Sequence, residues 1–413
     1  MRAHVTLPLI LAICLFALGH SKAAPLAEEY LLEGRLSEGE KELLEHLSDN
    51  PKDDEARYGL GAIQFLLTFE HLGTSLYEHV LRTERAFPGM ARQIREILPQ
   101  NPAPKPMRYE DARRIVQTFV DDLKKAEATL AKIEDDNVKL PLHVGLIKID
   151  LFGIGKPVNA AFVLGEIEGD LPEDPVKSFV IGFDRGDVNW LRGYCHFLCA
   201  AGEVVLGVDE KELFDRTAHL FFEKVDTPHK FLLEEDRNFE RAAWWDVRLF
   251  SDVIAFIHLM RFPMKEPQRM QAAHKHLQAT VANSREMWKH YKREMDDDNE
   301  WIPNPRQTGV LQVKVSEKMV ATWLETVSEA EQVLDGEKLI PFWRGENDKR
   351  GVNLKRVFTE PRDLDPILWF QGTAATPYLE EGEITEFANR ETLRQINDTF
   401  GGLEFFGFAF WFN

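Results

Sequence analysis

The chain reads FDRGDVNWLRGYCHFLCAAGEVVLGVDEKELFDRTAHLFF over residues 183–222, and this stretch decides its fold. Apolar side chains recur there at helical spacing, which predicts two amphipathic helices joined by a turn at 207–209. Asp187 and Asp209 stand before the two apolar runs, where a carboxylate can accept hydrogen bonds from the free amides of a helix start. A turn this short predicts that the two helices lie side by side. We expect the other helices to pack around this hairpin.

The hairpin also carries the best candidates for chemistry. His196 and His219 are expected to face each other across the two helices, with Asp215 and Glu203 as carboxylate partners. Two imidazoles and a carboxylate can hold a divalent metal, or they can form a base that an acid orients. The alternative is that each histidine is satisfied by a local hydrogen bond, because the chain contains no HExxH or paired CxxC motif. Phosphate-binding glycine loops are also absent, so no nucleotide cofactor is predicted.

The first residues, 1–23, have the pattern of a signal peptide. Arg2 precedes an apolar run over 7–18, and the small residues Ser21 and Ala23 suit a cleavage site. We therefore expect an exported protein, periplasmic or secreted. No later run approaches the ~20 apolar residues that a membrane-spanning helix needs, so no membrane insertion is expected after this segment is removed.

The charge balance is acidic. The chain has 50 basic and 69 acidic residues, and removal of 1–23 would take away Arg2 and Lys22 but no acid, which changes the net charge from −19 to −21. Such a surplus repels phosphate backbones and anionic lipids. The composition therefore argues against nucleic acid as a partner.

The segment 24–98 shows a helical repeat pattern. Its two expected helices carry Tyr30, Gly34, Leu36, Gly39, Leu43 and Leu47; a Pro51 break follows, and then Ala56, Tyr58, Leu60 and Gly61. This pattern resembles the tetratricopeptide repeat, with one complete unit and the opening helix of a second. The resemblance implies a helical segment that binds proteins or peptides, and that the rest of the chain must cap.

A proline-rich connector at 99–106 is the best predicted boundary. The central domain, 107–336, is expected to contain helices at 110–133, 238–260, 267–295 and 316–334, together with a small β-hairpin of 140–151 and 179–183. The last part, 337–413, is predicted to be an α+β closing segment. Its expected strands are 339–343, 352–358 and 367–371, with a helix at 378–397. The aromatic end 403–413 is expected to be buried as a strand or a closing tail.

The predicted fold class is therefore mainly α, a multi-helix bundle with a repeat-like N-terminal segment and a small β element. The expected function is an exported scaffold or binding protein for a protein or peptide, and the alternative is a metal-dependent enzyme with its site on the hairpin. The candidate partner-binding surface consists of Tyr30, Tyr58, Trp301, Trp343 and Trp369. The sequence does not predict an oligomeric state.

Overall fold

A computed structural model describes residues 24–79, 101–159, 180–234, 247–310, 313–344, 350–388, 390–401 and 404–412. The expected signal peptide at 1–23 lies outside these residues. So do positions 80–98 of the repeat-like segment and the start of the connector.

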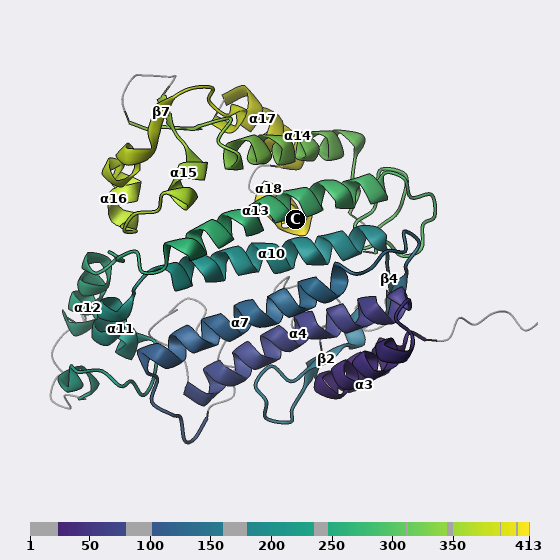
Figure 1. The fold of residues 1–413 in the computed structure, drawn as a ribbon, viewed down its shortest axis with the longest axis horizontal. Coiled ribbons are helices and arrows are strands. Elements are labelled where there is room, and N and C mark those ends of the chain that lie inside the picture. The colour runs from purple at the N-terminus through teal and green to yellow at the C-terminus, as the bar shows by residue number, and fades with distance from the viewer. Residues whose placement is uncertain are drawn as a thin grey trace, which may run out of the picture.

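The protein is mainly α-helical, as the sequence predicts. Its longer helices are α2 (Leu26–Glu33), α3 (Leu36–Asp49), α4 (Asp54–His79), α7 (Tyr109–Leu130), α10 (Arg185–Gly207), α12 (Val247–His258), α13 (Pro267–Tyr291), α14 (Glu317–Leu334), α17 (Arg390–Phe400) and α18 (Glu404–Phe412). In Figure 1 the central helices α4, α7, α10, α13 and α14 lie next to one another in chain order. Each helix thus packs against the helices that precede and follow it in this array.

The β structure of the described residues consists of short strands in small antiparallel sheets. Strand β1 (Leu140–Leu142) pairs with β4 (Ile181–Phe183), and β2 (Lys148–Ile149) pairs with β3 (Val158–Asn159). A three-stranded sheet near the C-terminus has the order β5 (Ile340–Pro341), β6 (Arg350–Val352) and β7 (Leu379–Glu381). The pairing of β1 with β4 confirms the predicted hairpin, and a 3-10 turn at Val144–Leu146 interrupts the longer strand that was expected.

Helix α10 is the central element. Its start is fixed by a capping box, in which the Asp184 side chain accepts from the amides of Gly186 and Asp187, while Asp187 accepts from the amide of Asp184. The N-cap is therefore Asp184, and Asp187 occupies the third helical position instead of preceding the helix as expected. Along its length α10 packs against α7 on one side and α13 on the other.

The N-terminal helices pack closely because small residues stand at their contacts. Gly34 ends α2 with φ +72°, a conformation that glycine adopts without strain. A side chain at Gly39 would place its Cβ 2.6 Å from that of Tyr30, so α2 and α3 require glycine there. These helices share one hydrophobic core with β1 and the start of α10, so residues 99–106 do not separate two independent cores. The tetratricopeptide resemblance remains a prediction.

The predicted side-by-side hairpin of 183–222 is wrong. The second half forms α11 (Lys211–Thr217) and a 3-10 turn (Ala218–Leu220), and α11 packs against α12 and the start of α7. The physical reason lies in the turn, which is extended at Val208 (φ −110°, ψ 169°) and directs the chain away from α10. The apolar side chains of α10 are instead covered by α7 and α13.

The C-terminal part contains more helix than predicted. Expected strands at 352–358 and 367–371 are mostly the helices α15 (Leu354–Thr359) and α16 (Pro366–Gln371). Their side-chain caps, Asn353 and Asp365, each accept a hydrogen bond from an amide three residues later, and this stabilises a helix start. The aromatic tail also forms a helix, α18, whose Phe412 is completely buried. Of the predicted helix at 378–397, residues 379–381 are strand β7, residues 386–388 form a 3-10 turn, and α17 begins only at Arg390.

Among the described residues, no helix combines the length and the apolar character needed to cross a membrane.

Candidate functional site

The two histidines of the predicted site have different partners. His196 on α10 lies with its Nδ1 2.9 Å from Nδ1 of His276 on α13, and its Nε2 is 3.4 Å from a carboxylate oxygen of Glu127 on α7. His219 Nε2 is 3.1 Å from a carboxylate oxygen of Asp252 on α12. The expectation that His196 and His219 form one site is therefore wrong, because α11 does not fold back along α10.

The two expected carboxylates are also engaged elsewhere. Asp215 accepts two hydrogen bonds of 2.8 Å from Lys211 on its own helix. Glu203 is buried on α10 and neutralised by Lys124 at 2.5 Å and Arg269 at 2.9 Å. The predicted metal site of His196, His219, Asp215 and Glu203 is not assembled.

The pair of His196 and His276 forms a relay between three helices. Because both facing atoms are Nδ1, one ring must donate and the other must accept. Burial and the neighbouring His196 lower the pKa of His276 to about 4, so this ring is neutral at pH 7. Hydrogen bonds from His196 and Arg192 hold the pKa of Glu127 at about 2 despite its burial. The hydrogen-bonding groups of Glu127, His196 and His276 thus bond to one another, and these bonds connect α7, α10 and α13.

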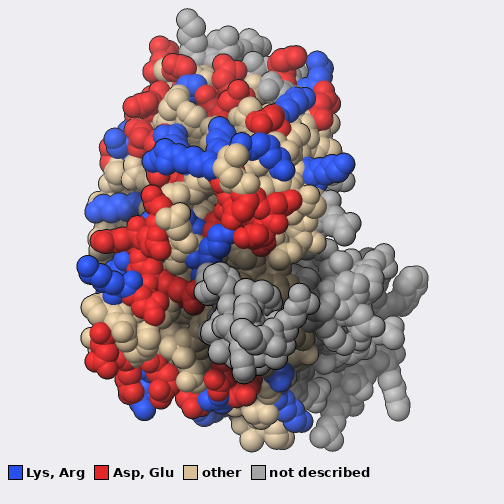
Figure 2. Space-filling model, turned by 90° about the vertical axis from the view of Figure 1, so that its right-hand side faces the viewer, with Lys and Arg blue, Asp and Glu red and all other residues tan. Residues whose placement is uncertain are grey.

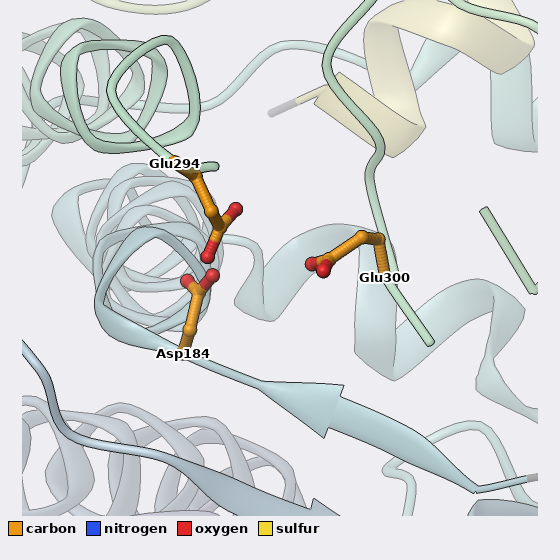
Figure 3. A group of neighbouring side chains, drawn as sticks. All are labelled: Asp184, Glu294 and Glu300. Carbon is orange, nitrogen blue, oxygen red and sulfur yellow. The ribbon is translucent and has the colours of Figure 1, made fainter. Parts of the chain in front are cut away.

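A different set of side chains converges at the start of α10. Figure 3 shows the carboxylates of Asp184, Glu294 and Glu300 pointing toward one another, and one oxygen of each lies within 4.8 Å of the others. We call these three residues the carboxylate cluster. Asp184 directly follows β4, Glu294 follows α13, and Glu300 lies in the next loop. Asp184 and Glu300 are buried, and no other group of three potential metal ligands meets this spacing in the described parts of the chain.

The loop after α13 is tied to the start of α10. Tyr291 donates a 2.5 Å hydrogen bond to Asp187, and the amide of Gly182 donates to the carbonyl of Asn299. Asn299 itself adopts φ +66°, which turns the chain so that Glu300 points inward. These contacts bring Asp184 together with Glu294 and Glu300, which stand more than 100 positions later in the sequence.

Burial and mutual repulsion raise the pKa values of two carboxyl groups in this cluster, Glu294 and Glu300. The pKa of Glu300 is raised to about 7 by burial and by the charge of Asp184. Burial and a hydrogen bond to Asp184 raise the pKa of Glu294 to about 10. Like charges this close favour retention of protons, and a hard cation with oxygen ligands would relieve the same repulsion. The carboxylate cluster can therefore either share protons or bind a cation. Asp184 has a structural role as well, because it caps α10.

The face beside this cluster carries mixed charge. Figure 2 views the end of the molecule where β4 and the start of α10 lie, and it shows acidic and basic side chains next to each other among the described residues. Lys139 at this end bonds Asp298 at 2.9 Å and also Asp296. The acidic run 296–298 is therefore partly neutralised by Lys139, which directly precedes β1.

The five aromatic residues predicted as a partner surface do not form one. Tyr58 is 3% exposed and belongs to the core, and the guanidinium of Arg35 covers the half-buried Tyr30. Trp301 packs edge-on against Trp190 and Trp411, and Trp369 stacks on Tyr378. Of the five, only Trp343 is exposed, at 51%.

A groove of about 1080 Å³ opens at the other end of α10. We call it the end groove. It lies between α11, the end of α12, the following loop and the start of α16, and it contains Asp215 of the predicted site. Since α10 has 23 residues, this groove and the carboxylate cluster are separated by about 34 Å along that helix.

No known protein family, no curated protein and no solved structure matches this chain.

Proposed function

We propose that the protein is an exported binding protein that holds a helical peptide segment of a partner in the end groove. The observation that carries this proposal is an apolar stripe on α12 that continues into the groove. Phe250, Val253, Ile254 and Ile257 recur at the spacing of one helix face and are 62%, 44%, 51% and 48% exposed. An apolar face of this kind is typical of a surface that another helix covers.

The opposite face of α12 already has its own partner. Phe256 contacts Phe221 with 5.9 Å between ring centroids, and Asp252 binds His219. The exposed stripe is therefore not the face that attaches α12 to the protein. Across the groove, Ile367 and Leu368 of α16 are 46% and 45% exposed, so both walls offer apolar contacts.

The groove is lined by acidic and basic side chains, and the basic ones at the end of α12 suit a carboxylate of the partner. Its carboxylates are already engaged, as Asp215 is by Lys211, Glu212 by Arg216 and Asp365 by the amide of Leu368. Arg261 and His258 also line the groove, and neither has a polar partner among the described residues. A guanidinium beside apolar side chains suits a peptide that combines apolar anchors with a carboxylate.

Binding of synthetic peptides tests this proposal. Two 18-residue amphipathic helices with the same leucine face, one with glutamate and one with lysine on the polar face, would be titrated by fluorescence anisotropy. The acidic peptide should bind more tightly. Ile257→Asp should weaken it at least tenfold, because a carboxylate replaces a central apolar contact.

Leu44 on α3 provides a matched control. It is 48% exposed, like Ile257, but α3 lies far from the end groove (Figure 1). Leu44→Asp should leave peptide binding unchanged. Arg261→Glu should reverse the preference toward the lysine peptide. Absence of binding by either peptide, or equal losses in Leu44→Asp and Ile257→Asp, would contradict the proposal.

A further inference from the structure

An apolar cavity of about 180 Å³, partly open at the surface, lies between the N-terminal helices and α10, distant from the end groove. Leu31 of α2, Tyr58 of α4, Leu142 of β1 and Leu191 of α10 are buried in its walls. Half-buried side chains complete the lining, among them Phe183 and Trp190. The cavity is thus built by helices and a strand that are far apart in the sequence.

The lining offers almost nothing to a water molecule. None of the described lining residues is charged, and their polar side-chain groups are the Tyr58 hydroxyl and the Trp190 indole. The Trp190 Nε1 already donates to the carbonyl of Trp411 at 2.8 Å. Burial raises the pKa of Tyr58, so its phenol stays neutral. A water molecule needs two to four polar partners, which this cavity does not supply.

The size of the cavity matches a small organic molecule. An apolar cavity of ~150 Å³ stays dry and binds benzene. The cavity here is somewhat larger, and the rings of Phe183 and Trp190 can contact an aromatic ligand edge-on or face-on. A bound apolar molecule would recover the dispersion contacts that the empty lining lacks.

We propose that this cavity is a second binding site, which takes one compact, uncharged hydrophobic molecule or ring of about the size of toluene. A ligand charge inside this space is disfavoured, because none of the described lining side chains supplies a counter-charge. This site is independent of the end groove, and either one can exist without the other.

Thermal unfolding with toluene and with benzoate tests the proposal. Toluene at ten times its dissociation constant should raise the Tm by about 1–3 °C, whereas benzoate, which adds a carboxylate to the same ring, should not. Ala62, on the half-buried side of the lining, provides the blocking variant. Ala62→Met places a flexible apolar side chain in the cavity and should weaken toluene binding at least tenfold.

Ala321→Met is the matched control, because it adds the same side chain on the exposed face of α14. It should bind toluene like the wild type. No response of the wild type to toluene, or an equal response in Ala62→Met, would overturn the assignment. If Ala62→Met does not fold, toluene-soaked crystals of the wild type decide: density between α4 and α10 supports the site, and density elsewhere or none refutes it.

Discussion

Replacement of Glu300 by glutamine should make the protein more stable at alkaline pH. The pKa of this buried carboxyl is raised from 4.5 to about 7 in the folded protein. The folded state thus holds the proton more tightly than the unfolded state does, so the contribution of Glu300 is fully favourable below pH 4.5 and is lost as pH rises through about 7. At 1.36 kcal/mol per pKa unit, the loss is about 3 kcal/mol by pH 8.

The Glu300→Gln side chain cannot ionise, and its amide oxygen can still accept the 2.9 Å hydrogen bond from the amide of Asp298. We expect the difference in free energy of unfolding between the variant and the wild type to rise by about 2–3 kcal/mol, in favour of the variant, as the pH increases from 4.5 to 8. Urea unfolding at pH 4.5, 6 and 8, followed by tryptophan fluorescence with EDTA present, measures this difference. Glu337→Gln, at an exposed carboxylate, is the control and should show no such trend. A difference between Glu300→Gln and wild type that is the same at pH 4.5 and pH 8 would refute the reasoning.

Three other outcomes are expected. Ser316 caps α14 by accepting from the amide of Met319, so Ser316→Ala should lower the free energy of unfolding by about 1 kcal/mol in urea titrations, whereas Ser316→Thr should retain most of it. Phe412 is completely buried, and Phe412→Ala should cost about 3–5 kcal/mol; a loss below 1 kcal/mol would show that α18 does not close the core. Cys195 and Cys199 are buried thiols whose pKa is raised by that burial, the latter to about 12, so Ellman's reagent should label them only after unfolding in urea; rapid labelling of the native protein would contradict this arrangement.

The helices could be predicted from the sequence where apolar spacing is regular over several turns, as in α7, α10, α13 and α14. The short C-terminal helices could not, because 352–358 and 367–371 are rich in β-branched and aromatic residues that also suit strands. Asn353 and Asp365 were the available signals, since each stands directly before a helix as a cap.

The candidate sites depended on contacts that spacing alone does not determine. Glu300 stands more than 100 positions after Asp184 in the sequence, and the two meet only because α10 and α13 lie side by side. The same packing brings His276 to His196. The sequence analysis paired His196 with His219, whereas the structure pairs it with His276, because α13 and not the second half of the predicted hairpin lies beside α10.

Helix α10 contributes side chains to several hydrophobic clusters at once. Val188 and Leu191 belong to the N-terminal core, Cys195 and Cys199 to the core shared with α7, and Ala200 to the one shared with α13. Because α10 takes part in each of these clusters, its unfolding would disrupt all of them at once. The amide protons of this helix should therefore exchange with deuterated solvent only through global opening of the molecule, and they should be the slowest of the chain.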